Sequence, residues 1–157
     1  MGQSTDGQIS YGVYFEEGFE FPWSEDKYEG DIDDWWRDVN GYKPPFEPFT
    51  EEGHWAEGFS TKDPRMKEYH GHRMSWDEDN PIPVELVNAC SCDYPEWIVS
   101  IPGTVTRCNR GYPTQLEPEN GEFDVSKEDI ENLMAFFEKY GIECPSKPAW
   151  YLSSYLG

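Results

Sequence analysis

The sequence predicts a single α+β domain with an aromatic-rich core, and three observations lead to this fold class. A length of 157 residues suits one compact domain, which buries roughly two thirds of the surface that its unfolded chain exposes. Aromatic side chains make up 17% of the chain, whereas disordered sequences of low hydropathy contain few of them. Segments with strand periodicity and segments with helical periodicity both occur. We expect residues 1–157 to form an antiparallel β-meander of three to four strands packed with about three helices.

The strands are predicted from alternation and from β-rich composition. Over residues 8–15 the alternation puts four apolar side chains on one side of an extended chain: Ile9, Tyr11, Val13 and Phe15. Residues 83–92 and 96–101 are β-rich runs with a short turn between them, which predicts an antiparallel hairpin. After the turn at residues 102–103, residues 104–108 are expected to form the third member of the meander.

Two helices are predicted in the first half of the chain. Asp31 is a suitable N-cap for a short helix that ends near Asn40. The apolar residues of this helix follow the i, i+3, i+4, i+7 spacing of a buried face: Ile32, Trp35, Trp36 and Val39. A second helix is expected to begin at Asp63-Pro64, as a cap followed by proline at the first helical position, and to continue to about Asp77.

The third helix has the clearest signals. Ser126 and Asp129 have the spacing of a capping box, and Gly141 suits a C-terminal cap. The apolar positions of the helix line one face: Ile130, Leu133, Met134, Phe137 and Tyr140. Residues 109–124 are rich in turn-forming residues and are expected to be a surface loop. Residues 144–157 are too aromatic for a loose tail, so we expect them to dock on the core.

Residues 42–55 form an aromatic segment in which three prolines exclude regular helix. The segment contains four large side chains: Tyr42, Phe46, Phe49 and Trp55. Two interpretations stay open. The aromatic residues either pack into the core, as is usual for soluble monomers, or they are anchors of a recognition surface beside neighbouring carboxylates.

The charge of the chain bears most directly on function. Thirty-two acidic and twelve basic side chains give a formal net charge of −20. A field of this sign repels nucleic acids and anionic membranes, which argues against direct binding of either. It favours cationic protein partners, and many cationic protein surfaces are nucleic-acid-binding grooves. The alternative interpretation is that the carboxylates only keep the protein soluble.

Residues 16–38 are the most acidic part of the chain, with ten acidic and two basic side chains. We therefore place the candidate partner-binding surface around this segment and the acidic pair that follows the prolines. The candidate residues are Glu25, Asp26, Glu29, Asp31, Asp33, Asp34, Asp38, Glu51 and Glu52.

Three of these acids fall on one side of the first predicted helix: Asp31, Asp34 and Asp38. They step along the helix axis by about 4.5 and 6 Å. Phosphates of one DNA strand advance by about 3.4 Å, so this row roughly imitates alternate phosphates. Arg37 lies four residues after Asp33 and is expected to pair with it. The competing interpretation is an ordinary solvated helix face.

Cysteine and histidine supply suitable ligand types for a metal: Cys90, Cys92, Cys108, Cys144, His70 and His72. The spacing does not fit, because zinc knuckles rarely use Cys-x-Cys and two helical histidines two residues apart point about 200° apart. Phosphate-binding loops and nucleophile elbows are also lacking. We predict no metal, no cofactor and no catalytic residue, with free, largely buried thiols. A small enzyme or metal-binding protein that uses Cys and His is the alternative function.

The sequence has no stretch of about 20 apolar residues and no signal-peptide pattern, so we expect a cytoplasmic protein that does not bind membranes. The opening residues 1–7, the Trp35-Trp36 pair and residues 40–45 resemble small, acidic, uncharacterised proteins of tailed bacteriophages. That resemblance implies the cytoplasm of an infected bacterium. It also implies inhibition of a host enzyme or defence complex acting on nucleic acid, of the restriction or CRISPR type, and it transfers no functional residue.

Overall fold

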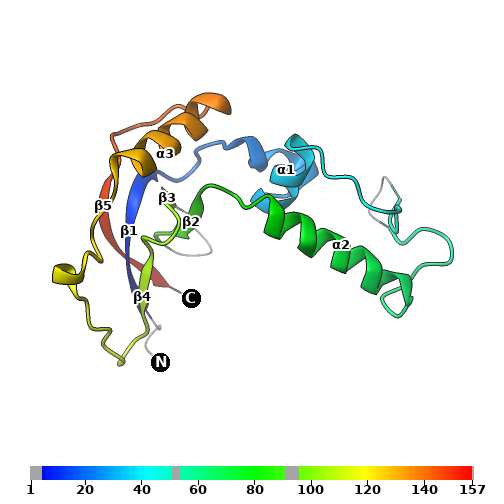
Figure 1. The fold of residues 1–157 in the computed structure, drawn as a ribbon, viewed down its shortest axis with the longest axis horizontal. Coiled ribbons are helices and arrows are strands. Elements are labelled where there is room, and N and C mark those ends of the chain that lie inside the picture. Colours follow the sequence, from blue (N-terminus) through cyan, green and yellow to red (C-terminus); the bar gives the residue numbers. More distant parts are fainter. Residues whose placement is uncertain (1–4, 51–53, 91–95, 157) are drawn as a thin grey trace. The chain divides into compact units, whose positions relative to one another are not determined.

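The computed structural model describes residues 5–50, 54–90 and 96–156. Its internal contacts group into two compact units (Figure 1). The first comprises Met1–Pro22 together with Pro83–Gly157, and the second is Trp23–Ile82. The α+β class and the three helices are confirmed, with a five-stranded antiparallel sheet where three to four strands were expected. That these units make up a single domain stays a prediction.

The sheet of the first unit is built around β1 (Thr5–Phe15) (Figure 1). One edge of β1 pairs with β5 (Ala149–Leu156). The other edge pairs with β4 (Thr106–Cys108) through its first half and with β3 (Trp97–Ser100) through its second half. Beyond β3 lies β2 (Glu85–Asn88), so the predicted hairpin is confirmed. Since β3 and β4 pair with successive halves of the same edge of β1, β4 continues β3 along that edge and does not add a third strand to a meander.

Both faces of β1 contain buried side chains, although its sequence predicts one buried face, and Ile9 and Tyr11 of the predicted face are only half-buried. Val13 and Phe15 are fully buried on the expected face, where Phe15 meets Phe137 at a ring-centroid distance of 5.8 Å. On the opposite face, Ser10 is 1% exposed and Gln8 is also buried. Small and polar side chains can therefore mark a buried face that a hydrophobic pattern does not reveal.

Helix α3 (Lys127–Lys139) has the predicted capping box. The Ser126 side chain accepts the Asp129 N–H at 3.0 Å, and the Asp129 carboxylate accepts the Ser126 N–H at 3.3 Å. The buried side chains of the helix are Leu133, Phe136 and Phe137. Met134, expected on this face, is 37% exposed, so the apolar stripe is rotated slightly toward Phe136. Gly141 ends the helix at φ 67°, followed by buried Ile142.

The second unit contains α1 (Ile32–Val39) and α2 (Arg65–Asp79), preceded by the 3-10 turns η1 (Pro22–Ser24) and η2 (Asp26–Tyr28). Trp35 is the buried apolar residue of α1, and its ring lies 5.1 Å from that of Trp23.

The two helices of this unit are linked by a side-chain hydrogen bond. The Trp36 Nε1–H donates to the Asn80 carbonyl at 2.8 Å. Val39 was expected on the buried face but is 44% exposed, and the buried residues of the helix are Trp35 and Arg37. The predicted start of the second helix is confirmed, since the Asp63 carboxylate accepts the Arg65 N–H at 2.9 Å.

The sequence left two interpretations of the aromatic segment 42–55 open, namely packing and an exposed recognition surface. The structure contains side chains that fit each of them. Phe46 is half-buried, stacks on Phe59 at 5.5 Å and contacts Tyr69. Phe49 and Trp55 form an antiparallel bridge with their rings 4.7 Å apart, and each is 39% exposed. Packing therefore accounts for Phe46, while the Phe49–Trp55 pair remains accessible.

Candidate functional site

Seven of the nine candidate carboxylates lie close together on the Trp23–Ile82 unit, and all seven are exposed. We call this group the α1 acidic surface. Its members are Glu25, Asp26, Glu29, Asp31, Asp33, Asp34 and Asp38. Glu51 and Glu52 lie outside the described residues.

A tight turn between η2 and α1 brings these acids together. Glu29 ends η2 in the left-handed region at φ 50°, and Gly30 follows at φ 83°. The Asp31 N–H donates to the Tyr28 carbonyl at 2.7 Å, which ties the start of α1 to the end of η2. The acids of both elements consequently belong to one local surface.

Asp31 is the N-cap of α1, as its sequence position predicts. Its carboxylate accepts the N–H groups of Asp33 at 2.7 Å and Asp34 at 3.1 Å. The negative charge also lies at the positive end of the helix dipole. Removing this carboxylate would therefore affect the helix as well as the surface charge.

Asp38 is bound at the other end of the helix. One carboxylate oxygen accepts the Tyr28 hydroxyl at 2.5 Å and the Lys27 ammonium at 3.2 Å. These two hydrogen bonds hold the pKa of Asp38 below its usual value. Tyr28 is buried, so this contact joins the surface to the packed interior of the unit.

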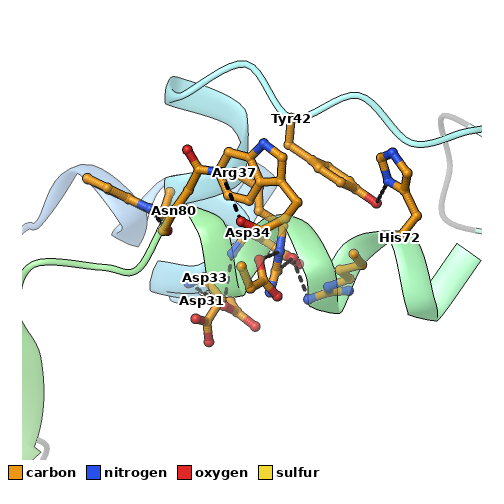
Figure 2. Close-up of polar contacts among 11 residues, drawn as sticks. Asp31, Asp33, Asp34, Arg37, Tyr42, His72 and Asn80 are labelled. Carbon is orange, nitrogen blue, oxygen red and sulfur yellow. Dashed lines mark hydrogen bonds and ion pairs between the residues drawn. The ribbon is translucent and has the colours of Figure 1, made fainter.

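Arg37 organises the middle of the site. It is 8% exposed, and its guanidinium donates to both oxygens of Asp77 at 2.8 and 2.7 Å. It also donates to Asp34 at 2.7 Å, and Arg73 reaches the same Asp34 oxygen at 3.0 Å. This network joins α1 to α2 (Figure 2).

The pairing predicted from spacing was between Arg37 and Asp33, and the structure replaces it with Asp34 and Asp77. Figure 2 shows Arg37 bonded to Asp34, while Asp31 and Asp33 lie beside one another. Partial burial, followed by the charge of Asp31, raises the pKa of Asp33. The spacing rule considers only one helix, and it missed Asp77 because that residue lies on another.

The α1 acidic surface therefore contains two kinds of carboxylate. Asp31, Asp34 and Asp38, the row that resembles phosphate spacing, are exposed but each has an intramolecular partner. Within the described residues, the Glu25 side chain has only a 3.8 Å contact with Lys27. Three others have no ion pair or side-chain hydrogen bond among the described residues: Asp26, Glu29 and Asp33. The carboxylates of Glu25, Asp26, Glu29 and Asp33 are therefore more available to a partner than those of the row.

We expect Asp38→Asn to lower the unfolding free energy of this unit by about 1 kcal/mol at neutral pH, because the side chain is half exposed and its hydrogen bonds are partly screened. The pKa of Asp38 is lowered in the folded state, so its contribution is present above the ordinary value of 3.8 and is lost as pH falls through the lowered pKa. Urea unfolding of both proteins at several pH values measures this difference. A difference that persists unchanged at strongly acidic pH would contradict the assignment.

The alternative ligand residues do not converge in the described part of the chain. No group of three or more His, Cys, Asp or Glu side chains is placed there to hold a metal ion. Cys90, Cys108 and Cys144 are free thiols, half-buried and not largely buried as expected. Burial raises the pKa of the Cys144 thiol, which makes it a poorer nucleophile. Cys92 lies outside the described residues.

The acids are not confined to this surface, since each of the two units contains half of them. The Trp23–Ile82 unit is the shorter one and so has the higher density of acidic residues. Comparisons with protein-family models, curated proteins and solved structures gave no match. The site therefore rests on its own geometry. Within the described ranges, no helix is long and apolar enough to cross a membrane.

Proposed function

We propose that the protein is an inhibitor that binds the basic surface of a host nucleic-acid-handling protein or defence complex, of the restriction or CRISPR type, in the cytoplasm of a bacterium. The observation that supports this most is the set of exposed, weakly engaged carboxylates at the η2–α1 turn: Glu25, Asp26, Glu29 and Asp33. Such a surface attracts a positively charged groove and speeds association with it. It would thereby occupy a groove that otherwise holds nucleic acid.

The mode of mimicry follows from which acids are available. The row Asp31, Asp34 and Asp38 is tied into helix capping and ion pairs, so neutralising it would confound binding with folding. The weakly engaged acids lie on the turn that precedes α1 and on its first residues. We propose that these acids contribute the negative charge that imitates nucleic acid, while the row on α1 holds the turn in place.

The test uses a quadruple variant that removes four charges from the turn: Glu25→Gln, Asp26→Asn, Glu29→Gln and Asp33→Asn. A matched control removes four exposed acids of the other unit that have no ion pair or side-chain hydrogen bond among the described residues: Glu17→Gln, Glu20→Gln, Glu138→Gln and Glu143→Gln. Both variants have the same net charge. The readout is capture of proteins from bacterial lysate at low and high salt, with the captured proteins identified by mass.

We expect the wild type and the control to capture a nucleic-acid-handling protein at low salt and to lose it as salt rises. The quadruple turn variant should bind that protein at least about tenfold more weakly, since four rim charges affect association together. Salt-insensitive capture would count against the proposal. Equal weakening of the control would show that total charge matters and that the turn does not.

A further inference from the structure

Strand β5 forms one edge of the sheet in the first unit (Figure 1). All eight of its residues pair with β1 in one continuous register, so the strand has no bulge. Within the described ranges, β5 has no other strand partner. The backbone N–H and C=O groups that point away from β1 are therefore open to pairing with a further strand.

Sheet edges in natural proteins are normally protected by short strands, charged side chains, proline or bulges. The outermost strands on the opposite side of this sheet fit that rule. β2 is four residues long and contains Glu85, and β4 is three residues long and contains Arg107. β5 lacks all four protections, since Ala149–Leu156 contains no charged residue and no proline in a chain of which 28% is charged. This edge is built in a way that permits pairing with another strand.

An exposed apolar side chain lies at the middle of this edge. Leu152 is opposite Ile9 of β1 and is 84% exposed. Trp150, on the same face, is half-buried and contacts Tyr11 and Phe123 at ring-centroid distances of 5.4 and 5.0 Å. The packing on this face thus stops before Leu152, whose apolar surface is left in contact with solvent.

We propose that β5 pairs antiparallel with β5 of a second copy of this chain, so that the two sheets become one across a two-fold axis. An axis perpendicular to the sheet brings residues of the same face opposite each other. Centred on Leu152, it places this side chain against Leu152 of the second copy. Tyr151 and Trp150 then lie opposite Ser153 and Ser154 of the second copy. The contact covers both exposed leucines and pairs the open backbone groups of both edges.

The charge of the edge favours a second copy over a segment of a basic protein. Lysine or arginine side chains of such a segment would meet no carboxylate on β5, because the strand has none. Two copies of an uncharged strand place no like charges across the contact. The net charge of −20 on each copy opposes association at longer range, but salt screens it beyond about 8 Å at physiological ionic strength. This inference does not rest on the proposed function.

The first test measures the mass of the full chain in solution by sedimentation equilibrium over a range of protein concentrations. We expect a monomer–dimer equilibrium with a Kd on the order of 10–100 µM, because a contact along one strand is smaller than the roughly 1,200 Å² at which standard interfaces begin. The dimer should tighten as salt rises, whereas capture of a basic protein should weaken. A chain that is still monomeric at about 1 mM, well above that Kd, would overturn the proposal, and so would a dimer that weakens with salt.

Charge exchange at Leu152 tests the register. Leu152→Glu and Leu152→Lys each remove the apolar contact and place two like charges opposite each other, so each should weaken the dimer at least about tenfold. An equimolar mixture of the two variants should regain association as a heterodimer, because glutamate then faces lysine. Recovery in the mixture would also show that both variants fold.

Met74→Glu is the matched control, since Met74 is 63% exposed on α2 of the other unit and undergoes the same change from apolar to acidic. It should leave the dimer unchanged. The proposal is overturned by a Leu152→Glu protein that dimerises like the wild type, by equal weakening in Met74→Glu, or by a mixture that does not associate. A monomeric wild type whose capture of a lysate protein is lost in Leu152→Glu would instead assign the edge to an extended segment of another protein.

Discussion

Gly12→Ala is expected to disrupt the β1–β3 pairing and to cost about 3 kcal/mol or more of unfolding free energy, enough to leave much of the protein unfolded. A Cβ atom at Gly12 would lie 2.2 Å from the Val99 carbonyl oxygen and 2.7 Å from the Ser100 Cα. Both obstacles are backbone atoms, so no side-chain rotation can relieve the clash. Gly12 also pairs with Ala149 of β5, so a displacement of β1 would disturb its pairing with both β3 and β5.

Chemical unfolding and the yield of soluble protein measure this effect. Gly71→Ala is the matched control, because Gly71 lies inside α2 and a Cβ there meets nothing within 4 Å. That variant should be more stable than the wild type by up to about 1 kcal/mol, since alanine favours helix over glycine. A Gly12→Ala protein with wild-type stability would mean that β1 and β3 do not approach each other as closely as described.

Arg37→Met is expected to lower the unfolding free energy of the Trp23–Ile82 unit by about 2–3 kcal/mol, because it removes the buried guanidinium that Asp77 and Asp34 share and leaves Asp34 with Arg73 alone. Asp77 loses two hydrogen bonds and Asp34 loses one. The estimate lies below the value for fully buried pairs, since the side chains of both aspartates are more than a third exposed. Methionine retains most of the side-chain volume, so the loss of packing is small.

Arg73→Met is the control, since Arg73 also bonds Asp34 but is one-third exposed and makes no other ion pair with the residues that the structure describes. We expect it to cost less than about 1 kcal/mol. Hydrogen exchange of α1 and α2 amides localises the effect, and only Arg37→Met should accelerate it strongly. If both variants behave alike, the buried network does not hold these helices together.

Local signals in the sequence predicted the helix ends well. Asp31, Ser126 and Gly141 act within a few residues of their own position, so the capping hydrogen bonds follow from spacing alone. The acidic segment was also visible in the sequence, because charge density needs no fold to be counted. The sequence could not show which of these acids are available to a partner, because every aspartate in that segment is chemically the same until the chain has folded.

By itself, the sequence determined the α+β class, the three helices with their caps, the β2–β3 hairpin and the excess of negative charge. Each of these depends on interactions over a few residues or on composition. Only the tertiary structure decided that β1 lies between β5 and the β3–β4 edge, that Gly12 must be glycine, and that Arg37 binds Asp77 forty residues away. Those features depend on which distant segments meet, and a pattern read along one segment contains no information about the groups that will face it.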